Sequence, residues 1–268
     1  MTSGVLTVIG CPILEDELVY SILNDDENKD IYLVESEPSK SLIKKLERHN
    51  IPYTTINGQD FINGTKTFDP SRYSIVIKML NMALHAEPKD LRAKVEEEAA
   101  SMSHVSDVIA LYYGMCGNFG WDASKWAEEK GLCPVVVFRD EKNRVCDDCV
   151  GVAVGGVDNY LKLLKAHTGR MLFTPCVAVN WSDFMDANEM FKGLPEKNIE
   201  HMRWLFEYCN YDTVVEIDTG LGDRGEMRKA TKEFAETYDF KIIKGEEHWP
   251  NLYPAKRIYR DAKQILRS

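Results

Sequence analysis

The chain has 268 residues, of which 44% are hydrophobic, and it carries a net charge of −10. This length and apolar content suit one large domain with a sizeable buried core, and they exclude an intrinsically disordered chain. The negative charge repels phosphate backbones and anionic lipid, so we expect neither nucleic acid nor a membrane surface as a partner.

The first residues lead from Thr2 and Ser3 directly into an apolar segment, without a basic region or a small-residue cleavage site. No apolar run approaches the roughly 20 residues that span a bilayer. We therefore expect a cytoplasmic protein. The seven cysteines are odd in number and widely spread, which favours reduced thiols over a disulfide scaffold.

Segments rich in Val, Ile and Tyr alternate with segments of helical periodicity, which is typical of βαβ units. In chain order, we predict a strand at 5–9, a helix at 12–23, a strand at 31–34, a helix at 38–49, a strand at 53–56, a loop at 57–72, a strand at 74–80, a helix at 88–102, strands at 108–113 and 133–138, a helix at 150–164, an extended segment at 170–179, a helix at 196–208, a strand at 213–218, a helix at 226–238 and a strand at 241–244.

This pattern predicts an α/β fold with a Rossmann-like, mainly parallel sheet flanked by helices. We predict a single domain over residues 1–268, because no low-complexity linker interrupts the chain. The alternative is two intimately joined halves, at about 1–180 and 181–268, since the segment 181–194 is the nearest thing to a boundary.

Three cysteines stand where parallel strands end or a helix begins. Cys11 follows the first strand, Cys116 follows the strand at 108–113, and Cys149 directly precedes the helix at 150–164. Ligands gather beyond the carboxyl ends of parallel strands, and a helix N-terminus favours the thiolate form of a cysteine. We predict that these three cysteines converge on one metal-binding or thiol site.

The turn that holds Cys116 contains further candidates. Gly114 and Gly117 bracket the cysteine, and Asn118 follows them. Glycine permits a positive φ or the close approach of a bound group, so the turn is a candidate for binding a cofactor. The alternative interpretation is a tight turn that happens to contain a buried cysteine.

Cys146 and Cys149 have the C-x-x-C spacing used for zinc, iron–sulfur clusters and dithiol redox chemistry. The intervening Asp147 and Asp148 would raise the pKa of the thiols, which argues against a thioredoxin-type oxidant but not against a cationic metal. A second C-x-x-C is absent, so other ligands must come from distant segments, with Cys176 as a reserve. An acidic turn with incidental cysteines is the alternative.

The loop at 219–224, which follows a predicted strand, could cradle an anion with its backbone amides. The candidate residues are Thr219, Gly220 and Gly222. The loop lacks the third glycine of a dinucleotide fingerprint and the lysine of a P-loop, so an ordinary turn is the alternative. Asp218 and Asp223 are candidates for oxygen ligands or a general base. His85, just before a helix, is a candidate ligand or proton carrier, or a structural histidine.

Five motifs, in order over nearly the whole chain, make the sequence similar to the uncharacterised domain-of-unknown-function family 1638. They are Val8-Ile9-Gly10-Cys11 with Glu17-Leu18, Leu84-His85 with Pro88, Tyr113-Gly114-Met115-Cys116-Gly117-Asn118, Asp148-Cys149, and Ile217-Asp218-Thr219-Gly220-Leu221. The resemblance implies a single α/β unit whose shared cysteines match Cys11, Cys116 and Cys149, with Glu17 and His85 as further shared positions.

One departure from the family pattern concerns the Asp-Cys pair. The pattern commonly has a histidine immediately before it, whereas Asp147 stands there in this chain and Cys146 precedes Asp147. Cys146 therefore becomes a candidate substitute ligand. The resemblance also implies an anaerobic setting, often beside corrinoid-dependent methyltransferase systems, and hence an association with corrinoid and one-carbon metabolism.

The leading hypothesis is a metalloprotein of methyl-transfer metabolism, in which Cys11, Cys116 and Cys149 bind zinc or an iron–sulfur cluster and leave one position open. Glu17, His85 and Asp148 are the candidate catalytic residues. Two alternatives remain: a non-catalytic accessory protein that docks on a corrinoid protein or methyltransferase, and a small-molecule or nucleotide-binding domain that uses the loop at 220–224. The metal, the substrate and the oligomeric state are left open.

Overall fold

The computed structural model describes residues 2–82, 88–118, 120–187, 199–245 and 251–268. It contains a six-stranded sheet in the order β3-β2-β4-β1-β5-β6 and a three-stranded sheet in the order β7-β8-β9. The strands of the first sheet are β1 (Gly4–Gly10), β2 (Asp30–Val34), β3 (Thr54–Ile56), β4 (Tyr73–Met79), β5 (Val108–Tyr112) and β6 (Val135–Val137). All paired strands are parallel, which confirms the predicted Rossmann-like α/β fold.

The centre of this sheet is β1, between β4 and β5. Gly10, at the end of β1, lies in register with Met79 of β4 and Tyr112 of β5. From β1 the chain passes to β2, toward the β3 edge of the sheet. From β4 it passes to β5, in the opposite direction, toward the β6 edge. Such a reversal opens a crevice at the carboxyl ends of the strands, where ligands of open α/β sheets bind.

Helices cover both faces of the first sheet. The side chains of Leu6 and Val8 pack with α1 (Glu15–Leu23), α2 (Ser39–Arg48) and α12 (Tyr253–Leu266). Ile9, on the opposite face, packs with α3 (Gly58–Ile62), α4 (Pro88–Met102) and α5 (Ala123–Glu129). This alternation along β1 follows from the two-residue period of a strand, and both faces are apolar because both are covered.

The second sheet consists of β7 (Met171–Phe173), β8 (Thr213–Glu216) and β9 (Lys241–Lys244). Around it lie α8 (Pro175–Val179), α9 (Trp181–Ala187), α10 (Ile199–Tyr208) and α11 (Arg224–Tyr238). Phe234 of α11 is central to its core, because its ring lies 4.8 Å from that of Phe173 and 5.5 Å from that of Trp181. Such edge-to-face and tilted contacts stabilise an aromatic core.

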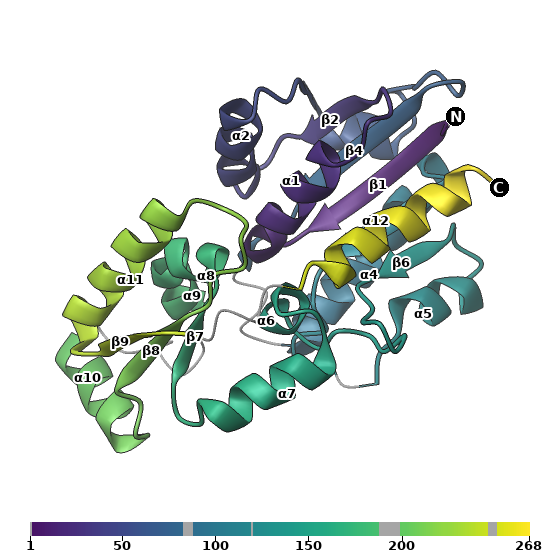
Figure 1. The fold of residues 1–268 in the computed structure, drawn as a ribbon. Coiled ribbons are helices and arrows are strands. Elements are labelled where there is room, and N and C mark those ends of the chain that lie inside the picture. The colour runs from purple at the N-terminus through teal and green to yellow at the C-terminus, as the bar shows by residue number, and fades with distance from the viewer. Residues whose placement is uncertain (1, 83–87, 119, 188–198, 246–250) are drawn as a thin grey trace.

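Two short helices lie between the sheets, as Figure 1 shows for α6. They are α6 (Cys149–Ala153) and α7 (Val157–Ala166). The prediction of one continuous helix at 150–164 is wrong, because Gly155 and Gly156 adopt positive φ values of 91° and 119°. Cys149, in the first turn of α6, contacts the hydrophobic clusters of both sheets.

Other local predictions also fail for identifiable reasons. The segment predicted to be extended at 170–179 turns into α8 after β7, because the Thr174 side chain caps that helix and Pro175 is its first residue. The predicted loop at 57–72 contains α3, which is capped by Asn57. The helices α5, α9 and α12 were not predicted. Residues 196–198 of the predicted helix at 196–208 lie outside the described residues, and α10 begins at Ile199.

The helix α12 returns from the second sheet to the first. Ile258 and Ala262 are fully buried there, and Figure 1 shows α12 lying along β1. The division of the chain at about residue 180 stays a prediction, but the core of the first sheet includes this distant segment. Among the helices that the structure describes, none has the length and apolarity to cross a membrane.

Candidate functional site

Cys11 and Cys116 follow the neighbouring strands β1 and β5, and Cys149 begins α6 close to the loop that holds Cys116. Cys11 directly follows β1, and its backbone N–H donates to the Tyr112 carbonyl at 3.1 Å. The pKa of Cys149 lies well above its ordinary value, first because the thiol is buried and then because negative charges on Asp148, Cys116 and Cys11 oppose its ionisation. The pKa of Cys116 is raised in the same way, first by burial and then by the negative charge of Cys11. The thiols therefore interact electrostatically.

The loop that carries Cys116 is joined directly to the loop before α6. The backbone N–H of Cys116 donates to the carbonyl of Asp147 at 2.7 Å. Cys116 has a φ of +46°, a left-handed conformation that costs energy for a residue other than glycine. Strained backbone of this kind is common at functional sites.

Gly117 and Asn118, two further candidates in this loop, determine its conformation. Gly117 has a φ of +86°. The Asn118 side chain donates to the Pro88 carbonyl at 2.8 Å and to the Met115 carbonyl at 3.1 Å. Asn118 thereby ties the loop to the start of α4. These contacts position Cys116, and they leave the assignment of Gly114, Gly117 and Asn118 to a cofactor as a prediction.

The three thiols are not preassembled around a metal position. Within the described residues, no group of three or more His, Cys, Asp or Glu side chains is arranged so that it could hold a metal ion. Burial raises the pKa of Cys11 to about 12, so its thiol is protonated at neutral pH. A metal would have to displace thiol protons and draw the side chains inward.

Cys146 occupies a different environment from Cys149, although only two residues separate them. It is buried in the core cluster that includes Leu6 and Ile258. Burial raises its pKa to about 12, and Asp140 contributes most among the neighbouring charges. This packing favours a structural role over the ligand role that the C-x-x-C spacing predicts.

Glu17 is buried in α1 near the thiols, with 4% of its surface exposed. Among the described residues, its Oε2 has no hydrogen-bond partner. Burial raises the pKa of its carboxyl to about 8, and Asp16 adds to the rise. At neutral pH this carboxyl therefore carries a proton, as a general acid must. When Glu17 is ionised, its negative charge helps to raise the pKa of Cys149 and of Cys176.

The raised pKa of Glu17 predicts a pH-dependent stability. The unfolded chain releases this proton near pH 4.5, whereas the folded protein keeps it to about pH 8, so folding loses free energy as the pH rises between these values. In metal-free protein, we expect Glu17→Gln to reduce the fall in unfolding free energy between pH 6 and 8 by about 1 kcal/mol per pH unit. Urea denaturation at three pH values measures this slope.

The matched control for this prediction is Glu129→Gln, at an exposed position of α5. It should leave the slope as it is in the unmodified protein. If Glu17→Gln and the unmodified protein lose stability equally between pH 6 and 8, the Glu17 carboxyl is already ionised at pH 6 and the assignment of a neutral acid is wrong.

The other two catalytic candidates have different outcomes. Asp148 caps α6, since its Oδ1 accepts from the Gly151 N–H at 2.8 Å. Burial raises its pKa, while a hydrogen bond from Tyr160 lowers it. The capping role is structural, and it also places Asp148 beside Cys149. His85 lies outside the described residues.

A cavity of about 450 Å³ opens beside two of the three cysteines. Cys116, Cys149, Asp147 and Asp148 contribute to its lining at the thiols. Apart from Gly117, the remaining lining that the structure describes is largely apolar and comes from α6, α7 and the second sheet with its helices: Val150, Tyr160, Leu164, Met171, Leu172, Phe173, Val177, Trp181, Met185, Tyr211 and Phe234, with Arg170 as the one further charged residue among them. A small molecule in this cavity would lie next to the thiols.

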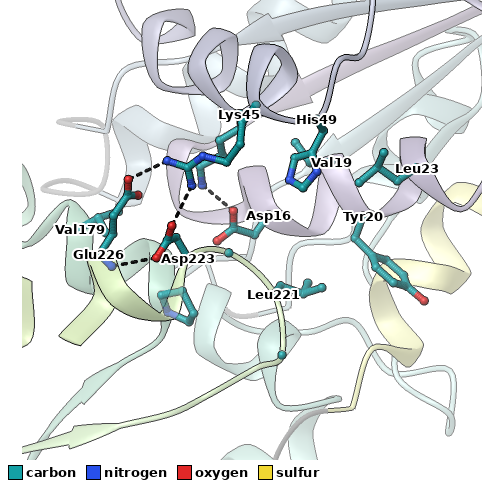
Figure 2. A pocket seen from close by; sticks show the side chains of 14 residues that line it. Asp16, Val19, Tyr20, Leu23, Lys45, His49, Val179, Leu221, Asp223 and Glu226 are labelled. Atoms are coloured by element: carbon teal, nitrogen blue, oxygen red, sulfur yellow. Dashed lines mark hydrogen bonds and ion pairs between the residues drawn. The ribbon is translucent and has the colours of Figure 1, made fainter. Parts of the chain in front are cut away.

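A second cavity, of about 260 Å³, lies between α1, α2 and α11 (Figure 2). Lys45 of α2 lines this cavity and stands at the centre of a cluster of polar side chains. Its Nζ lies 2.6 Å from Asp16, 3.4 Å from Glu15 and 3.0 Å from the sulfur of Cys176. Cys176 in turn donates to Asp16 at 2.9 Å. This arrangement uses Cys176 in a buried polar cluster, not as a ligand beside the other cysteines.

Arg48 lines the same cavity and also joins the two sheets. It pairs with Glu226 of α11 at 2.6 Å and with Asp223 at 3.4 Å. The cationic groups Lys45 and Arg48 therefore already have carboxylate partners. The cavity offers an anion little uncompensated positive charge.

The loop at 219–224 forms turns that use its own polar groups. The N–H of Gly220 donates to Asp218 at 2.9 Å, and the N–H of Leu221 donates to the Thr219 hydroxyl at 3.3 Å. Asp223 caps α11. Gly222 packs closely on Asp16. Because the amides of Gly220 and Leu221 are already bonded, this geometry favours the ordinary-turn interpretation over an anion cradle.

Two polar residues of these cavities were missed from the sequence. Lys45 lies within the predicted helix at 38–49, and only the fold reveals the carboxylates around it. Arg170 lies just before a strand, where no spacing rule assigns a function. In both cases the partner or the cavity comes from segments more than 20 residues away.

Comparison with known proteins gives one match. The family described as "Protein of unknown function (DUF1638)" matches residues 79–252. No curated protein and no solved structure matches the chain. The matched segment includes Cys116, Cys149 and the loop at 219–224, whereas Cys11 and Glu17 precede it.

Proposed function

Since the chain belongs to the DUF1638 family, whose description gives no activity, we propose a function from its own residues: it is a metalloprotein in which Cys11, Cys116 and Cys149 bind a zinc ion or an iron–sulfur cluster. The observation that carries the proposal is geometric: Cys11 and Cys116 follow the neighbouring strands β1 and β5, and a backbone hydrogen bond of 2.7 Å joins Cys116 to Asp147, two residues before Cys149. Three protein ligands leave one coordination position open for chemistry.

The local charges support a cation at this place. The thiols lie near the carboxyl groups of Asp148 and Glu17, and no cationic side chain is among the groups that dominate the pKa of Cys149. Without a metal, these groups must stay protonated, because a buried negative charge without a partner is costly. A divalent metal or a cluster would compensate the thiolates.

The open position would face the cavity that Cys116 and Cys149 line. Glu17 supplies a carboxyl that is protonated at neutral pH, so it can give a proton to a group bound near the thiols. This combination suits transfer of a small group, such as a methyl group, to or from a thiol or a metal. We propose methyl-transfer metabolism as its setting, with a corrinoid protein or methyltransferase as the partner.

The proposal predicts a stoichiometric loss of metal in cysteine variants. Unmodified protein that is reconstituted without oxygen, either with zinc or with iron and sulfide, should bind metal. The variants Cys116→Ser and Cys149→Ser should retain less than about a tenth of that metal, because the two remaining thiolates hold it weakly. Elemental analysis and the visible absorption spectrum measure both outcomes. Binding should strengthen as the pH rises, since the thiols must lose protons.

The matched control is Cys209→Ser, because Cys209 is exposed and far along the chain from the three thiols. It should bind as much metal as the unmodified protein. The melting temperature of each metal-free variant separates loss of metal from loss of fold. If Cys116→Ser folds and binds metal as fully as Cys209→Ser, the proposal is wrong.

A further inference from the structure

Among the described residues that line it, the cavity beside the thiols combines an apolar lining with a single guanidinium group. Its volume of about 450 Å³ lies within the roughly 300–1,000 Å³ of small-molecule pockets. The partly exposed rings of Tyr160, Trp181 and Tyr211 supply aromatic surface, and the fully buried Phe234 is in edge-to-face contact with Trp181. Such a lining binds the apolar body of a ligand, and the few polar groups fix its orientation.

Arg170 has little compensation for its charge. Its Nη1 lies 2.9 Å from Nδ1 of His167, which is not an anion. Among the described residues, no carboxylate forms an ion pair with it. Asp212 interacts with it only weakly, because the pKa of Asp212 is lowered first by Thr213 and Lys241 and least by Arg170.

The other half-buried arginines of the described chain differ from Arg170 in this respect. Each has a carboxylate oxygen within 3.2 Å of its guanidinium: Arg139, Arg144 and Arg257. A partly buried guanidinium without such a partner is a site where a planar anion can add two charge-assisted hydrogen bonds.

The acidic residues of the cavity determine which end of it an anionic group occupies. Asp147 and Asp148 line it beside Cys116 and Cys149, so they repel a negative group at the thiols. An anionic group is therefore favoured at Arg170, and the opposite end of the ligand is directed to the cysteines.

We propose that this cavity binds a small organic carboxylate with an apolar body, with the carboxylate on Arg170 and the body against Tyr160, Trp181 and Tyr211. The identification of this carboxylate as the substrate of the metal centre rests on the proposed function. Its binding to the cavity does not, because Arg170 directly precedes β7 and the three aromatic residues belong to α7, to α9 and to the segment before β8, apart from the cysteines.

The test is isothermal titration of the full chain with hexanoate, 4-phenylbutyrate and indole-3-propionate, each beside its neutral primary amide. We expect at least one carboxylate to bind at least about tenfold more tightly than its amide, which is the size of a charge-assisted hydrogen-bond pair. Arg170→Gln should bind carboxylate and amide equally. Arg228→Gln, at an exposed position of α11, is the control and should bind like the unmodified protein.

A second variant keeps the test decisive if Arg170→Gln does not fold. Trp181→Leu should weaken the carboxylate and its amide alike, because it removes aromatic contact without changing charge. The proposal is overturned if none of the three carboxylates binds with a Kd below about 1 mM, or if folded Arg170→Gln still prefers the carboxylate.

The same titration on Cys116→Ser separates this inference from the metal centre. Binding of the carboxylate to a Cys116→Ser protein that holds no metal supports the anion site by itself. Metal binding without any carboxylate binding supports the metal centre and overturns the anion site. Each failure is therefore visible independently of the other.

Discussion

Lys45→Met is expected to lower the free energy of unfolding by about 3 kcal/mol at pH 8, because it removes one partner of a buried ion pair. The Lys45 side chain is 17% exposed, while its partners Asp16 and Glu15 are 9% and 0% exposed. After the substitution, the carboxylate of Asp16 loses its only cationic neighbour within 4 Å among the described residues. Chemical denaturation of the metal-free protein measures the loss.

The same helix supplies the control for this prediction. Lys40 pairs with Glu37 at 2.8 Å, but the two side chains are 69% and 79% exposed. Lys40→Met should therefore change the unfolding free energy by less than about 0.5 kcal/mol. Asp16→Asn combined with Lys45→Met should recover part of the loss, because it removes the uncompensated charge. A loss below about 1 kcal/mol for Lys45→Met would show that Lys45 compensates no buried charge.

Gly114→Ala is expected to have an effect of comparable size, about 3 kcal/mol or more. A Cβ at this position would lie 2.5 Å from Cα and 2.7 Å from the carbonyl carbon of Asp148. Because these are backbone atoms, no side-chain rotation relieves the contact. The loop before α6 must move away, and with it Cys149. Denaturation and metal binding both measure this displacement, and both should decrease.

Gly151→Ala is the matched control, three residues beyond Asp148. There the added Cβ would have ordinary contacts of 3.6–3.7 Å, and the residue lies in α6, where alanine is the better helix former. We expect no loss of stability, or a gain of up to about 1 kcal/mol. Equal effects of Gly114→Ala and Gly151→Ala would contradict the close approach of the two loops.

The sheet could be predicted from the sequence because apolar periodicity reports burial directly. Runs such as Val108–Tyr112 are buried on both faces, and a continuous apolar run is typical of a central parallel strand. The helices were predicted less well where one residue changes the backbone. Gly155 and Gly156 divide a helix that periodicity predicts as continuous, and Thr174 starts one where an extended segment was predicted.

That Cys11 and Cys116 follow neighbouring strands could be predicted, because the carboxyl ends of parallel strands share one edge of a sheet, whereas the convergence of all three cysteines on one site stays a prediction. Their charge environment could not be predicted. It depends on burial and on partners such as Glu17, and these follow from tertiary packing. Likewise, the C-x-x-C spacing places Cys146 two residues from Cys149, but one side chain enters the core beside α12 and the other contacts both sheets.

The position of α12 has a consequence for how the chain matures. This helix covers β1, although about 250 residues separate them. At roughly 5–20 residues per second, the ribosome needs on the order of 10–50 s between the two segments. During that time Leu6 and Val8 lack their final cover. We expect the nascent chain to rely on chaperones over this interval and to reach a protease-resistant state only after α12 has left the ribosome.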